Sequence, residues 1–182
     1  MKLFWRSLIS LTVTLSTING GAMAQPKDLE ESQPPPELSS LEYFQGSWRC
    51  QQPAAPDSPS GIFTWRVKRD LNNFWYLGNA EEIKSSNDGK LINSREFMGY
   101  NTASKKLVRY VVVGNGNSYN LTASDWQDEK LVWEGTIVRM GKSTPLRQEI
   151  IQNNQDKFTA TYFIPDDEGN WKSVVNETCE RI

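Results

Sequence analysis

The chain has 182 residues, of which 20 are Lys or Arg and 22 are Asp or Glu, and its formal net charge at pH 7 is −2. A mildly acidic chain without a basic stripe argues against nucleic acid or an anionic lipid surface as a partner. The chain contains no histidine, which excludes Ser-His-Asp and Cys-His catalytic machinery and the commonest zinc sites.

The first 24 residues have the pattern of an export signal. Lys2 and Arg6 provide a positive start, an apolar middle diluted by Ser and Thr follows, and an Ala-Met-Ala cleavage site ends at Ala24. The alternative is a membrane anchor, but the apolar stretch is shorter than the about 20 residues that span a bilayer. We therefore predict that residues 1–24 are a cleaved signal peptide. The mature protein is then periplasmic or secreted, with no integral membrane segment and a net charge of −4, because the signal holds two basic and no acidic residues.

Residues 25–37 have the composition of a tether. Four prolines lie among charged and polar residues, and Leu29 is the one apolar side chain. Such segments cannot form a core and tend toward extended polyproline conformation. We predict a disordered tether, with a ligand for a proline-recognition domain as the alternative, and a folded domain over residues 38–182.

The rest of the chain predicts an all-β fold. A short helical turn is expected over Leu38–Phe44, where two apolar residues share an i, i+3 spacing. After it come short runs rich in aromatic and β-branched residues, separated by turn sequences such as Asn115-Gly116. Consecutive strands with tight turns form an antiparallel meander, and closure into an up-and-down barrel of about ten strands removes the exposed edges. The expected strands are Gly46–Gln52, Gly61–Asp70, Phe74–Lys84, Leu91–Tyr100, Lys106–Val113, Ser118–Gln127, Lys130–Met140, Pro145–Asn153, Phe158–Pro165 and Trp171–Ile182.

The two cysteines lie in the first and last predicted strands. Side chains alternate between the two faces of a strand, so Cys50 shares a face with Trp48. A barrel pairs its first strand with its last, which brings Cys50 beside Cys179. In an exported protein this placement predicts a disulfide bond; the alternative is two free buried thiols. Alternation in the last strand places these residues on the face expected to point inward: Trp171, Ser173, Val175, Glu177 and Cys179.

Four segments carry a resemblance to a known family. Phe44–Cys50 resembles the opening strand of calycin-type barrels, the superfamily of lipocalins and fatty-acid-binding proteins, in which Gly-x-Trp marks the closed end. Together with Arg95–Asn101, Lys106–Tyr110 and Leu131–Thr136, it is similar to a family of uncharacterised bacterial exported proteins with a domain of unknown function. The resemblance covers residues 41–182. It implies a small barrel with an interior cavity, often used for hydrophobic ligands, and no assigned activity.

A related group, the nitrobindin-like haem barrels, holds its iron through histidine, which this chain lacks. Haem ligation by Tyr or Met is chemically feasible, but the sequence shows no paired candidates. We therefore expect no cofactor and no metal.

Aromatic residues provide the candidate ligand-binding site. By alternation Trp65, Trp133 and Tyr162 face inward, and we predict that they form a pocket wall with Tyr110 and Glu177 as its polar groups. The alternative is that the rings simply fill the barrel. Trp126 is expected on a polar outer face.

Two function classes follow from these expectations. The favoured one is an exported protein that binds or carries a small apolar or amphipathic molecule. The alternative is an envelope structural or interaction protein with a filled barrel. An enzyme ranks third, below these two classes, because the sequence shows no nucleophile paired with a base. A cavity of about 300 Å³ or more would support the first class.

Overall fold

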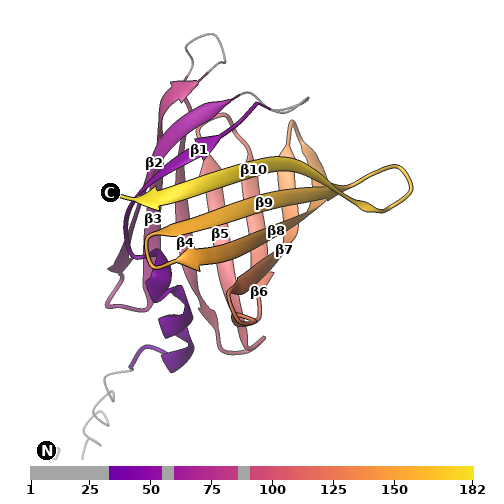
Figure 1. The fold of residues 1–182 in the computed structure, drawn as a ribbon. Helices are drawn as coiled ribbons and strands as arrows, with labels where there is room; N and C mark the ends of the chain where they lie inside the picture. Colours follow the sequence, from indigo (N-terminus) through magenta and orange to yellow (C-terminus); the bar gives the residue numbers. More distant parts are fainter. Residues whose placement is uncertain (1–32, 55–59, 86–90) are drawn as a thin grey trace, which may run out of the picture. The chain divides into compact units, whose positions relative to one another are not determined.

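The computed structural model describes residues 33–54, 60–85 and 91–182, and these form a closed barrel of ten antiparallel strands. Each strand pairs with the next in the chain, and the first pairs with the last (Figure 1). The predicted all-β up-and-down barrel is therefore confirmed. The predicted signal peptide and residues 25–32 of the predicted tether lie outside the described residues. Within the described ranges, no helix is long and apolar enough to cross a membrane.

One 3₁₀ helix, η1, precedes the strands and begins at Pro36, two residues before the expected helical turn. Most strand bounds lie within three residues of those predicted. The exception is β6, which ends at Ala123; beyond it, the Asp125 side chain accepts a hydrogen bond from the Trp126 amide. The elements are η1 (Pro36–Phe44), β1 (Gly46–Gln52), β2 (Gly61–Asp70), β3 (Trp75–Ser85), β4 (Asn93–Asn101), β5 (Lys106–Val113), β6 (Ser118–Ala123), β7 (Lys130–Arg139), β8 (Lys142–Asn154), β9 (Lys157–Pro165) and β10 (Trp171–Arg181).

The predicted disulfide is confirmed. Cys50 on β1 lies directly opposite Cys179 on β10, and the two sulfur atoms are bonded. The bond joins the first and last strands across a sequence separation of 129 residues, at the seam where the barrel closes.

A β-bulge corrects the predicted inner face of β10. Ser173 and Val175 are paired with successive residues of β9, so Val174 is an extra residue in the ladder. A bulge interrupts the alternation of side chains. Glu177 therefore points inward, as expected, but the inward placement of Trp171 and Ser173 is wrong, because both are exposed.

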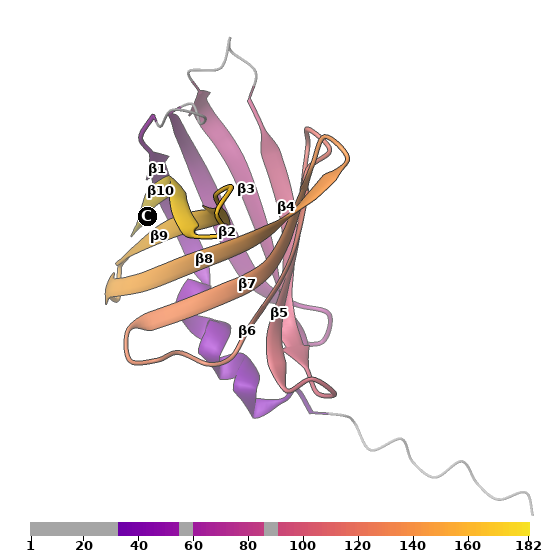
Figure 2. The ribbon, with the colours of Figure 1, turned by 90° about the vertical axis from the view of Figure 1, so that its right-hand side faces the viewer.

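Helix η1 closes one end of the barrel (Figure 2). Its apolar side chains Leu38, Leu41 and Phe44 are almost completely buried. The Trp48 indole N–H donates a hydrogen bond of 2.8 Å to the carbonyl of Phe44, and the Trp126 indole N–H donates one of 2.7 Å to a carbonyl of η1. The predicted outer position of Trp126 is therefore wrong. Strand β6 ends before it, so the alternation from which that position was predicted does not reach this residue.

The Gly-x-Trp sequence at the start of β1 has a steric reason. The Arg181 guanidinium lies over the Trp48 ring, 4.2 Å from its centroid, and donates to the Gln45 carbonyl at 2.7 Å. Gly46 has φ +126°, and a Cβ atom there would collide with the Arg181 side chain. Glycine at this position therefore allows the arginine to cover the tryptophan.

Candidate functional site

The barrel interior contains a cavity of about 290 Å³. It reaches the end opposite η1, because its walls include the turn residue Asn115 and residues at the ends of β1, β3 and β5. The side chains on its walls are both apolar and polar. The apolar ones include Phe63, Trp65, Ala80, Ile92, Val111, Val113, Leu121, Ile150 and Phe158, and the polar ones include Gln52, Glu82, Asn93, Glu96, Arg109, Asn117, Tyr119, Gln148, Tyr162 and Glu177.

A buried ion pair forms one part of this wall. The Arg109 Nε donates to a Glu96 carboxylate oxygen at 2.6 Å, and the two side chains are 12% and 4% exposed. Arg109 also donates through Nη1 to the Gln148 side-chain oxygen at 2.6 Å. Its guanidinium lies 5.7 Å from the ring centroid of Trp65, whose indole N–H donates to Glu96. Since a buried carboxylate needs a cation and hydrogen-bond donors to offset its desolvation, Glu96 is a satisfied charge.

The register between β3 and β4 explains how the Glu96 side chain fits inside the barrel. Gly78 on β3 lies directly opposite Glu96 on β4. A Cβ atom at Gly78 would collide with the Glu96 side chain. The glycine thus leaves the space that the carboxylate occupies.

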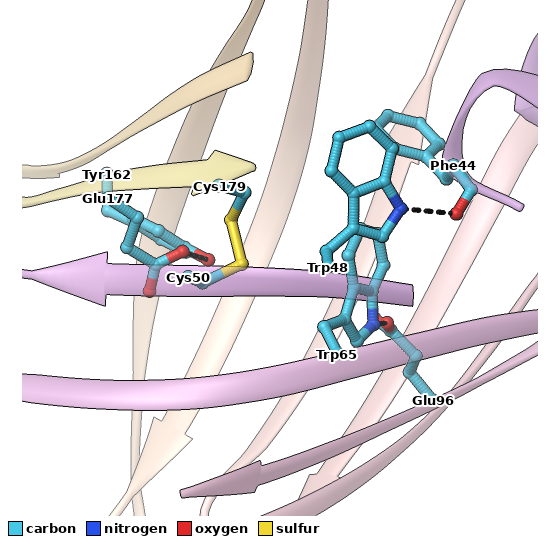
Figure 3. Close-up of a disulfide and its surroundings, with 8 residues drawn as sticks. All are labelled: Phe44, Trp48, Cys50, Trp65, Glu96, Tyr162, Glu177 and Cys179. Carbon is cyan, nitrogen blue, oxygen red and sulfur yellow. Dashed lines mark hydrogen bonds between the residues drawn. A yellow bond between two sulfur atoms is a disulfide. The ribbon is translucent and has the colours of Figure 1, made fainter. Parts of the chain in front are cut away.

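A second carboxylate, Glu177, lies on the opposite part of the wall beside the disulfide (Figure 3). It accepts a hydrogen bond of 3.2 Å from the Tyr162 hydroxyl. Burial raises the pKa of Glu177 to about 7; the charge of Glu96 acts in the same direction, whereas Arg109 and the bond from Tyr162 lower the pKa. Among the described residues, no lysine or arginine forms an ion pair with Glu177.

Two phenols complete the polar wall. Burial, reinforced by the charge of Glu177, raises the pKa of Tyr119 and raises that of Tyr162 well above its usual value. Both hydroxyls therefore stay protonated at neutral pH and can donate hydrogen bonds. The cavity thus offers a charged acceptor, phenolic donors and aromatic rings. Within the described ranges, no cluster of three or more His, Cys, Asp or Glu side chains is placed to hold a metal ion.

The structure brings three of the five predicted site residues together: Trp65, Tyr162 and Glu177 lie on the cavity wall. Trp133 points inward, as alternation predicts, but it is fully buried in the core and does not line the cavity. Its indole N–H has no hydrogen-bond partner among the described residues. The expectation that Tyr110 is a polar group of the pocket is wrong, because Tyr110 is 41% exposed on the outer face.

Arg109, the neighbour of Tyr110, occupies the inward position instead. The alternation in β5 was ambiguous, since valines occur on both faces of the strand. Glu96 was missed for a similar reason, because large apolar residues occur on both faces of β4: Phe97 is exposed and Met98 is buried. Leu107 and Met98, which are buried two residues away from Arg109 and Glu96, were the signals that could have identified both.

No protein-family model matches the sequence, and no curated protein matches it. Several solved structures are similar to this chain. The crystal structure of Rv2717c from M. tuberculosis is 10% identical, with a TM-score of 0.60 over 82% of this chain and 99% of that one. The redesigned β-barrel mFAP1 bound to DFHBI is 14% identical, with a TM-score of 0.43 over 78% of this chain and 98% of that one. At this identity, the first likeness shows the fold alone.

Proposed function

We propose that this protein is an exported binding or carrier protein that holds a small apolar or amphipathic molecule in its barrel. The observation that supports this most is the cavity of about 290 Å³ with its mixed apolar and polar walls. Ligand pockets are typically about 300 to 1,000 Å³, mostly apolar, with a few placed polar groups. The volume is at the lower end of that range and favours a compact ligand. Trp65, Tyr162 and Glu177 are the proposed contacts, joined by Arg109.

Two features support the export part of the proposal. The first 24 residues carry the pattern of a cleavable signal. The disulfide between Cys50 and Cys179 is of the kind that persists in oxidising compartments outside the cytosol.

The alternative, an envelope interaction protein, draws support from the outer face of the barrel. Phe97, Tyr110 and Val112 on β4 and β5 are 40%, 41% and 57% exposed. Tyr110 also contacts the ring of Trp75, with centroids 6.4 Å apart. Exposed apolar clusters can mark protein contacts. The interior cavity distinguishes the two proposals, since an interaction protein has no need of it.

A neutral fluorescent probe, N-phenyl-1-naphthylamine, tests the binding function. We expect saturable binding with quenching of tryptophan emission, because Trp65 lines the cavity. Ala80 also lines it, and Ala80→Phe should fill the space and weaken binding by about tenfold or more, equivalent to about 1.4 kcal/mol. Val112→Phe adds a ring on the outer face and serves as the matched control. Absence of saturable binding, or equal affinity in both folded variants, would contradict the proposal.

A further inference from the structure

The cavity contains more negative than positive charge at its polar wall. Among the described residues, Arg109 is the one cation on this wall, and its guanidinium is held by Glu96 and by the Gln148 side chain. Within the same ranges, Glu177 accepts a hydrogen bond from one side chain, through the Tyr162 hydroxyl. With Glu96 and Arg109 paired, no described residue provides a counterion for the ionised form of Glu177.

Aromatic rings line the same cavity as this carboxylate. The cavity walls include the rings of Phe63, Trp65, Tyr119, Phe158 and Tyr162. The faces of such rings attract cations, and the attraction increases when the site is desolvated. A wall that combines several rings with an uncompensated carboxylate is chemically complementary to an organic cation with an apolar body.

We propose that the cavity selects compact amphipathic amines, whose ammonium group binds Glu177 while the apolar part lies against the aromatic wall. This inference rests on the proposed function and names its ligand class. The competing ligand is an organic anion that binds the guanidinium of Arg109, but it would place a third negative charge beside Glu96 and Glu177. A neutral ligand would leave the charge of Glu177 without a partner.

Protonation of Glu177 controls this selectivity. Below its pKa of about 7 the carboxyl group is neutral and no longer attracts an ammonium group. Groups on four other strands act on it electrostatically: Glu96 forms an ion pair with Arg109, Arg109 stays a cation, and the phenols stay protonated. They are Glu96 on β4, Arg109 on β5, Tyr119 on β6 and Tyr162 on β9.

Calorimetry at about pH 8 tests the charge preference with three probes that share a phenyl ring and have similar chain lengths. They are phenethylamine, 2-phenylethanol and 3-phenylpropionate. We expect the amine to bind about tenfold or more tightly than the alcohol and the acid. Between about pH 8 and pH 5.5 the affinity of the amine should fall by up to about 30-fold. Over that interval the ionised fraction of Glu177 falls from about nine-tenths to about 3%, while the amine keeps its charge.

Glu177→Gln should remove both the preference for the amine and its pH dependence, and should leave binding of 2-phenylethanol within about twofold. The matched control is Glu180→Gln on the same strand, because Glu180 is exposed and paired with Lys157. Equal binding of the three probes, tightest binding of the acid, or an unchanged amine preference in Glu177→Gln would overturn the inference. Each would leave the proposed function standing if the neutral naphthylamine still binds. If the naphthylamine also fails to bind, the proposed function falls as well.

Discussion

The two ends of this barrel use the same strands for different purposes. At the end closed by η1, six aromatic residues pack with ring centroids 5.0 to 6.2 Å apart, and the indole N–H groups of Trp48 and Trp126 donate to backbone carbonyls. Toward the other end the interior contains a cavity, an ion pair and a carboxylate to which no described lysine or arginine is paired. Close packing stabilises the fold, whereas buried charge and empty space cost stability.

Trp65 lies at the boundary between the two regions. Its ring contacts Phe44 and Phe158 in the aromatic cluster, and its indole N–H donates to Glu96 on the cavity wall. The contrast predicts that substitutions at the closed end mainly lower stability. Substitutions on the cavity wall are expected to alter binding and its pH dependence.

Phe44→Ala should have the largest effect on stability. Phe44 is 1% exposed, and its ring centroid lies 5.4 to 5.8 Å from those of four other aromatic residues. Truncating a buried Phe typically costs about 3 to 5 kcal/mol, from lost transfer energy and the cavity that remains. Denaturant unfolding measures the change, with Phe97→Ala on the outer face as the control. Equal losses for the two variants would contradict the assignment of the closed end as the stabilising region.

The double variant Cys50→Ala, Cys179→Ala should lower the free energy of unfolding by about 2 to 5 kcal/mol, because it releases a loop of 129 residues in the unfolded chain. Chemical reduction of the wild-type protein should shift its unfolding midpoint in the same direction and leave that of the variant unchanged. A midpoint insensitive to reductant in the wild type would show that the seam is held by strand pairing and core packing alone.

Glu177→Gln should stabilise the protein at alkaline pH. The folded state holds the Glu177 proton up to a pKa of about 7, whereas the ordinary pKa of a glutamate side chain is 4.5. Between those values the unfolded state binds fewer protons, so the wild-type free energy of unfolding falls as pH rises and levels off above about pH 7.

The stability difference between Glu177→Gln and wild type should therefore grow by about 2 kcal/mol from about pH 5.5 to 8.5. Urea unfolding at the two pH values measures it. Glu180→Gln should show no comparable pH dependence, because that exposed residue pairs with Lys157 at the surface. If the difference in free energy of unfolding between Glu177→Gln and wild type is the same at both pH values, Glu177 is ionised throughout this range. That result would weaken the contrast between the two ends of the barrel.

The barrel, its strand positions and the Cys50–Cys179 bond could all be predicted from the amino-acid sequence. These depend on local rules: β-branched and aromatic runs form strands, turn residues separate them, and closure of a meander pairs its first and last strands. The sequence also placed Trp65, Tyr162 and Glu177 inside, because alternation holds within an uninterrupted strand segment.

Only the tertiary structure decided which residues share the cavity. The bulge at Val174 reverses the alternation in β10, so Trp171 is exposed while Glu177 is not. In β5, valines on both faces hid the inward position of Arg109, whose burial depends on Glu96 and Gln148 from strands far apart in the sequence. Side-chain periodicity assigns a face only while each residue has one partner in the ladder. A buried charge is stable only where three-dimensional packing provides its partners, and no local pattern encodes that.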